Sequence, residues 1–130
     1  MTLAIKTDTA KAEVILLDRS GRQLSRRAWV AGRSLEADIF QAISRQLKKV
    51  KAGWRDIEGI VVFAGPGSFT GLRIGAAAAN ALAAGLGCPV AGSGGPDWLE
   101  DGLTALKSGR ADPIVLPDYG RQPGISSPKK

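Results

Sequence analysis

Apolar positions near the start of the chain predict three successive strands. Residues 2–7 contain Leu3 and Ile5, and residues 12–17 are rich in Val, Ile and Leu. Residues 18–21, Asp-Arg-Ser-Gly, have the composition of a tight turn. Residues 23–31 then alternate apolar and basic positions, as an antiparallel strand does. We therefore expect a three-stranded meander.

A helix is predicted next, because apolar residues recur at every third or fourth position. The series is Leu35, Ile39, Ile43, Leu47 and Val50. Lysines occupy the last turn, where the helix dipole favours cations. Phe40 lies off this stripe, which indicates a second apolar surface on the helix.

The middle of the chain alternates strand and helix. Residues 60–64 form a continuous apolar run, typical of a central strand covered on both faces. Residues 72–86 are small, free of proline and too many for a strand, so they are expected to form a helix. Residues 89–91 predict a short strand and residues 97–107 a last helix.

The resulting order, βββαβαβ, predicts an α/β half-domain in which helices pack on a mixed sheet. We place this domain at residues 1–106. The composition then changes, because four of the seven prolines fall among residues 113–130. Residues 107–130 are expected to form an extended tail rich in proline and glycine.

The composition excludes several function classes. The chain has 130 residues, 44% of them hydrophobic and 23% charged, as in an ordinary globular domain. It has no histidine, which excludes a Ser-His-Asp triad, a Cys-His pair and an HExxH zinc site. Cys88 is the single cysteine. No apolar run is long enough for a membrane span, and Lys6 and Asp8 interrupt any signal peptide, so a cytoplasmic protein is expected.

Positive charge is concentrated in one part of the chain. The overall net charge is +6, whereas residues 19–55 alone carry ten basic and two acidic residues, a net +8. Such a basic sector can attract a polyanion such as RNA. The alternative is that these side chains are simply solvated on an exposed helix and strand. The basic residues are Arg19, Arg22, Arg26, Arg27, Arg33, Arg45, Lys48, Lys49, Lys51 and Arg55.

The strongest local motif is a glycine-rich turn between the central strand and the small-residue helix. It comprises Gly65, Pro66, Gly67, Ser68, Phe69, Thr70 and Gly71. Free backbone amides at a helix N-terminus make anion binding physically available. The motif lacks the GK[ST] ending of a P-loop, and its third glycine falls one residue late for GxGxxG. The alternative is a tight turn in which Ser68 or Thr70 caps the helix and nothing binds.

These residues resemble a known family. The segment GPGSFTGLRIG at residues 65–75, which includes Arg73, is similar to the signature of the TsaB family, also called YeaZ. The opening LAIKTDTA, the helix at residues 35–50 and Gly-Cys-Pro-Val at residues 87–90 extend the resemblance to about residues 1–95. It implies an actin-like, RNase H-like fold and a non-catalytic dimerisation subunit of the complex that makes threonylcarbamoyladenosine in tRNA. The implied partners are a TsaD-like catalytic subunit, a TsaE-like ATPase and a second copy of the chain.

The chain departs from the family pattern in two places. Family members usually carry a second actin-like half, most of which is expected to be absent here. Residues 117–123 resemble the PxYxR close of full-length members. Lys6 also stands where the first strand usually ends with aspartate, a position that helps to hold metal and phosphate in active ATPases of this fold. No catalytic residue, cofactor or metal site is therefore expected.

Two sets of contact residues are predicted. The small-residue helix carries a ridge of residues four apart, which another helix can approach closely: Gly71, Gly75, Ala79 and Ala83. An adjoining stripe is expected to fill the sheet-facing core: Ile74, Ala78 and Leu82. The alternative is that the ridge packs on the chain's own sheet. The resemblance favours an interface that adds the earlier helix through Ile39, Phe40, Ile43 and Leu47. Lys48, Lys49 and Lys51 are candidates for contact with tRNA.

Two other function classes remain open. The chain is alternatively an actin-fold nucleotide-binding protein that uses Asp8 and Thr9, or a stand-alone basic RNA-binding module. A peptidase is excluded, because no histidine is available to bind metal. The scaffold role is preferred over both alternatives.

Overall fold

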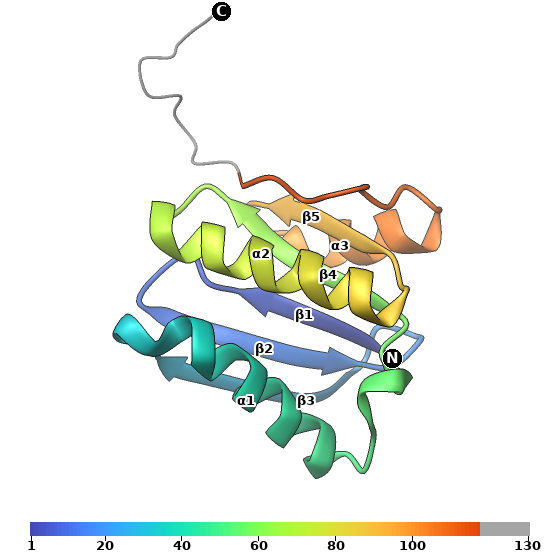
Figure 1. Ribbon diagram of the computed structural model, residues 1–130. Coiled ribbons are helices and arrows are strands. Elements are labelled where there is room, and N and C mark those ends of the chain that lie inside the picture. The colour runs from blue at the N-terminus through green and yellow to red at the C-terminus, as the bar shows by residue number, and fades with distance from the viewer. Residues whose placement is uncertain (118–130) are drawn as a thin grey trace, which may run out of the picture.

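The computed structural model describes residues 1–117 of the chain. Five strands form one mixed sheet with the spatial order β3-β2-β1-β4-β5 (Figure 1). β1 pairs antiparallel with β2 and parallel with β4, so the predicted meander and the parallel half of the sheet meet at this strand. The strands are β1 (Thr2–Lys6), β2 (Lys11–Leu17), β3 (Gln23–Val30), β4 (Gly59–Gly65) and β5 (Val90–Gly94).

Helices cover both faces of this sheet. α1 (Leu35–Lys49) and α2 (Phe69–Leu86) lie side by side on one face, and α3 (Trp98–Lys107) covers the other (Figure 1). Short 3-10 turns at Gly32–Ser34 and Trp54–Asp56 precede α1 and β4. The α/β class, the element order and the mixed sheet predicted from the sequence are confirmed.

β4 is the central strand that its continuous apolar run predicts. Ile60 and Val62 pack with α1 and α2 in the larger core cluster. Val61 and Phe63 point to the opposite face, where Phe63 meets Trp98 of α3 edge to face at 5.7 Å between ring centroids. A strand buried on both faces has no polar side, which explains the absence of alternation.

The beginning of α2 differs from the prediction. The helix begins at Phe69, three residues before the predicted start at residue 72. Ser68 is its N-cap, and the Ser68 hydroxyl accepts a hydrogen bond from the Gly71 amide at 3.5 Å. A serine in this position satisfies a free amide of the first turn, so the cap extends the helix into the glycine-rich motif.

The described residues that follow α3 pack along β5. Asp112 forms an antiparallel bridge with Val90, and its carboxylate accepts a hydrogen bond from the Gly92 amide at 2.8 Å. Val115 is buried, and the Asn80 side chain both donates to and accepts from its backbone. The packed part of the chain therefore continues past residue 106. Tyr119 and Arg121 of the expected PxYxR motif lie outside the described residues.

Two glycines of α2 are required by their closeness to Thr7. A Cβ atom on Gly71 would lie 2.1 Å from the Thr7 carbonyl oxygen, and one on Gly75 would lie 2.2 Å from Thr7 Oγ1. Both separations are far below van der Waals contact. Gly85, on the same helix, has no atom within 4 Å of such a Cβ.

We predict that Gly71→Ala lowers the free energy of unfolding by about 1–3 kcal/mol, because the helix must move away from a backbone atom. Gly85→Ala is the matched control and should raise it by about 0.5–1 kcal/mol through helix propensity. Urea denaturation followed by circular dichroism measures both changes. Equal stabilities for the two variants would contradict the close packing described above.

Candidate functional site

The glycine-rich motif packs against the turn that follows β1. The Ser68 amide donates a hydrogen bond to the Asp8 carbonyl oxygen at 2.8 Å. A Cβ atom on Gly67 would lie 2.6 Å from the Cβ of Asp8, so glycine is required for this contact. The buried Thr7 hydroxyl donates to the Gly71 carbonyl oxygen at 2.7 Å. The motif and the β1–β2 turn therefore form one packed unit.

The two charged residues at this place neutralise each other. Lys6 Nζ lies 2.6 Å from Asp8 Oδ1, and both side chains are partly buried. Lys6 Nζ also lies 4.6 Å from the centroid of the Phe63 ring, at cation–π distance. The Asp8 carboxylate is thus already paired. In residues 1–117 no three His, Cys, Asp or Glu side chains come together as a metal site would require.

The remaining signature residues lie around the start of α2. Phe69 and Thr70 are exposed in its first turn, and the Arg73 guanidinium lies 5.4 Å from the centroid of the Phe69 ring. Pro66 follows a cis peptide bond and is exposed. Further along, burial raises the pKa of the Cys88 thiol, which disfavours the reactive thiolate at neutral pH.

The small-residue ridge of α2 faces the sheet of its own chain, which corrects the expectation that it contacts a partner. Ala79 is 0% exposed and Ala83 7%, and Gly71 and Gly75 rest against Thr7. On α1, likewise, the three aliphatic residues expected at the interface are buried in the core. They are Ile39, Ile43 and Leu47.

The opposite side of α2 carries a second series of small residues. Ala77, Ala81 and Gly85 are also four apart, and all three are exposed. Of the three residues expected in the sheet-facing core, Ala78 is buried there, whereas Ile74 and Leu82 are half-buried and pack against the edge of this core. We call Ala77, Ala81 and Gly85 the outer stripe. The helix is therefore rotated relative to the prediction.

An apolar groove lies between the outer stripe and α1. Its volume is about 370 Å³. Phe40, which the sequence sets apart from the buried stripe of α1, forms part of one wall and is 38% exposed. Of the residues expected at the interface, Phe40 is the one that reaches this surface. The α1–α2 groove is lined by Phe40, Trp54, Ala81, Leu82, Gly85 and Leu86.

Trp54, Leu82 and Leu86 are therefore surface residues that the sequence analysis did not assign to this site. The available signal was the presence of large apolar side chains in the last turns of α2 and in the short turn before β4. Lys48, Lys49 and Lys51 are exposed at the end of α1, where solvent and a ligand can reach them. None of the helices within residues 1–117 has both the length and the apolar character that crossing a bilayer requires.

Comparisons with known proteins connect this fold to tRNA modification. The family model described as "TsaD: tRNA N6-adenosine threonylcarbamoyltransferase" matches residues 29–93. A protein of Cereibacter sphaeroides (strain KD131 / KCTC 12085) named tRNA N6-adenosine threonylcarbamoyltransferase is 32% identical over 94 residues, 68% of this chain and 26% of that protein. A second Cereibacter sphaeroides protein of the same name is 38% identical over 63 residues, 48% of this chain and 17% of that protein.

Two solved structures are similar to this chain in fold. The structure of YeaZ from Pseudomonas aeruginosa superposes with a TM-score of 0.65 and 29% identity, over 72% of this chain and 43% of that one. Another structure is that of an uncharacterized protein with similarity to peptidase YEAZ from Pseudomonas aeruginosa. It superposes with a TM-score of 0.66 and 29% identity, over 72% of this chain and 42% of that one. This chain therefore spans about a quarter or less of the curated relatives and less than half of the YeaZ structures.

Proposed function

We propose that this chain is a non-catalytic subunit of the complex that forms threonylcarbamoyladenosine in tRNA. The chain belongs to the family described as TsaD: tRNA N6-adenosine threonylcarbamoyltransferase. It has the fold of a YeaZ half-domain. The α1–α2 groove is the observation that carries this proposal. Its function is to bind and support a TsaD-like catalytic subunit, with a TsaE-like ATPase in the same complex. We place the protein in the cytoplasm, where such a complex meets its tRNA.

The groove has the properties of a helix-docking surface. The outer stripe presents no side chain larger than a methyl group, so the backbone of another helix can approach α2 closely. Phe40 and Trp54 supply aromatic area at the rim, and aromatic residues contribute strongly to protein interfaces. We therefore propose that an amphipathic helix of the TsaD-like subunit occupies the groove. A second copy of this chain is the competing occupant.

Substitution of the outer stripe tests this proposal. Ala81→Arg places a long charged side chain in the groove and should weaken binding of the TsaD-like subunit by about a hundredfold or more. Ala81 is exposed, so the variant should fold. Thr104→Arg, at an exposed position of α3, adds the same group on the other face of the sheet and is the control.

Titration calorimetry with the purified TsaD-like subunit measures the affinity of each variant. Wild-type affinity for Ala81→Arg would place the interface elsewhere. Analytical ultracentrifugation of the isolated chain identifies the competing occupant: a dimer that Ala81→Arg dissociates, with binding of the TsaD-like subunit unchanged, would assign the groove to a second copy.

The ion pair of Lys6 and Asp8 supports a role without catalysis. A carboxylate that holds metal and phosphate must be free to do so, and Asp8 is bound to Lys6 at 2.6 Å. We predict that the isolated chain releases no phosphate from ATP above the buffer rate, and that Asp8→Ala behaves identically in the same assay. Turnover that Asp8→Ala abolishes would favour the alternative, an actin-fold nucleotide-binding protein.

We also propose that the exposed lysines near the end of α1 contact tRNA in the assembled complex. Reversal of Lys48, Lys49 and Lys51 to Glu should weaken tRNA binding. Each lost phosphate contact should also make the negative slope of log K against log salt shallower by about one. Filter binding over a series of salt concentrations measures this slope. An unchanged slope would show that these lysines are only solvated. Equal tRNA affinity of the isolated chain and the complex would favour a stand-alone RNA-binding module.

A further inference from the structure

Exposed basic residues gather at one end of the sheet. At this end β1, β4 and β5 begin and all three helices finish (Figure 1), and we call it the amino end. α3 reaches it because Leu106 packs against Gly59, the first residue of β4, where a Cβ atom would lie 3.1 Å from Leu106 Cδ1. The chain then stays at this end as far as Asp112, which bridges to Val90 at the start of β5.

The cations of the amino end come from two distant parts of the chain. One group lies at the end of α1 and in the segment before β4, and belongs to the basic sector of residues 19–55. The other lies at the end of α3, outside that sector, and only the fold brings it to the same end of the sheet. The first group is Lys48, Lys49, Lys51 and Arg55, and the second is Lys107 and Arg110.

None of these six cations is neutralised by a carboxylate within residues 1–117. All six are exposed, and their side chains form no ion pair there. The side-chain hydrogen bond that one of them makes runs from Arg110 Nε to Ser108 Oγ at 2.8 Å, and a neutral hydroxyl leaves the positive charge in place. Both groups are therefore available to an anionic ligand.

A neutralised strip separates the two groups. It consists of the β2–β3 turn and the residues just before β4, where Arg19 pairs with Glu58 at 2.7 Å and Arg22 with Asp18 at 3.4 Å. α1 lies on one face of the sheet and α3 on the other (Figure 1). Helices about 10 Å across on the two faces place the two groups roughly 20 Å apart. The amino end thus offers two separate positive regions rather than one continuous patch.

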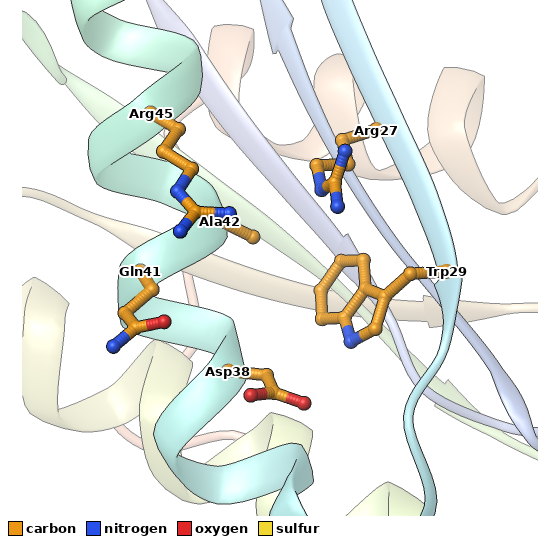
Figure 2. Close-up of a pocket in the computed structure, with 6 residues that line it drawn as sticks. All are labelled: Arg27, Trp29, Asp38, Gln41, Ala42 and Arg45. Carbon is orange, nitrogen blue, oxygen red and sulfur yellow. The ribbon is translucent and has the colours of Figure 1, made fainter.

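Two other exposed arginines lie outside the amino end. Figure 2 shows Arg27 of β3 and Arg45 of α1 on opposite sides of a hollow, which Asp38 also lines. This hollow lies on the flank of the molecule, between α1 and the edge strand β3. Arg27 and Arg45 therefore belong to neither group.

We infer that the amino end binds double-stranded RNA, with the cations of α1 on one backbone and those of α3 on the other. A duplex presents two rows of phosphates on either side of a groove, and double-stranded RNA is recognised largely through phosphate and 2′-hydroxyl contacts across its minor groove. The inference rests on the contact with tRNA proposed above. It extends that contact from one group of lysines to a double-stranded arm.

The positions of the aromatic residues favour a duplex over a single strand. Proteins that bind single strands combine positive charge with exposed aromatic rings on which bases stack. Phe40 and Trp54 line the α1–α2 groove, and Phe69 is exposed at the beginning of α2, at the opposite end of the sheet. Within residues 1–117 the cations of the amino end are thus not accompanied by a stacking surface, and contacts to the backbone remain.

Fluorescence anisotropy of a labelled RNA tests the inference with the full chain. The probe is an RNA duplex of about 16 base pairs, the length that double-stranded RNA-binding domains span. Lys107→Gln combined with Arg110→Gln should weaken binding by about tenfold and make the negative slope of log K against log salt shallower by about two. Both residues are exposed, so the variant should fold.

The control removes the same two residue types from the opposite end of the sheet. Lys11 at the start of β2 and Arg33 before α1 are exposed and form no ion pair within residues 1–117. Lys11→Gln combined with Arg33→Gln therefore changes the net charge equally, and it should leave the slope unchanged. An equal change of slope in both double variants would overturn the inference, because net charge alone would then explain it.

The remaining outcomes separate this inference from the proposed contact of α1 with tRNA. An unchanged slope for the α3 variant overturns the inference. The α1 contact survives that result if reversal of Lys48, Lys49 and Lys51 still makes the slope shallower, and both fail if it does not. A single strand of the same length that binds as tightly as the duplex would overturn the choice of double-stranded RNA. Absence of duplex binding at low salt would also overturn the inference.

Discussion

The contact between Thr7 and the first turns of α2 determines which side of that helix the protein exposes. Thr7 is fully buried, and its hydroxyl donates to the Gly71 carbonyl oxygen at 2.7 Å. Its oxygens occupy the positions that Cβ atoms on Gly71 and Gly75 would need. α2 can pack this closely in one rotation only, with these glycines toward the sheet. The outer stripe, displaced by two residues and therefore by about 200° around the helix, must then face solvent.

Packing against the β1–β2 turn accounts for the glycines at the start of the motif. Gly67 rests against the Cβ of Asp8, and the amide of the next residue, Ser68, donates to the Asp8 carbonyl oxygen. Lys6 in turn pairs with the Asp8 carboxylate. The β1–β2 turn of the same chain thus packs directly against the motif. Its glycines are needed for close packing, whereas in nucleotide loops they allow the backbone to approach a phosphate.

The sequence predicted the elements but not the rotation of α2. Strand and helix types follow from periods of two and 3.6 residues, which are local, and the central position of β4 follows from its unbroken apolar run. Both sides of α2 carry small residues four apart, so periodicity does not distinguish Ala79 from Ala81. The deciding contact joins Thr7 to Gly71, 64 residues away in sequence. Phe40 is exposed, as its position off the buried stripe predicts, because a large apolar residue off that stripe is itself a local signal.

Helix α1 separates two surfaces of different chemistry. Its buried face, with Ile39 and Ile43, fixes the helix on the sheet. One flank presents Phe40 to the α1–α2 groove, and the other presents Arg45 toward β3. A helix that docks in the groove contacts α1 through the Phe40 flank and leaves the Arg45 flank uncovered.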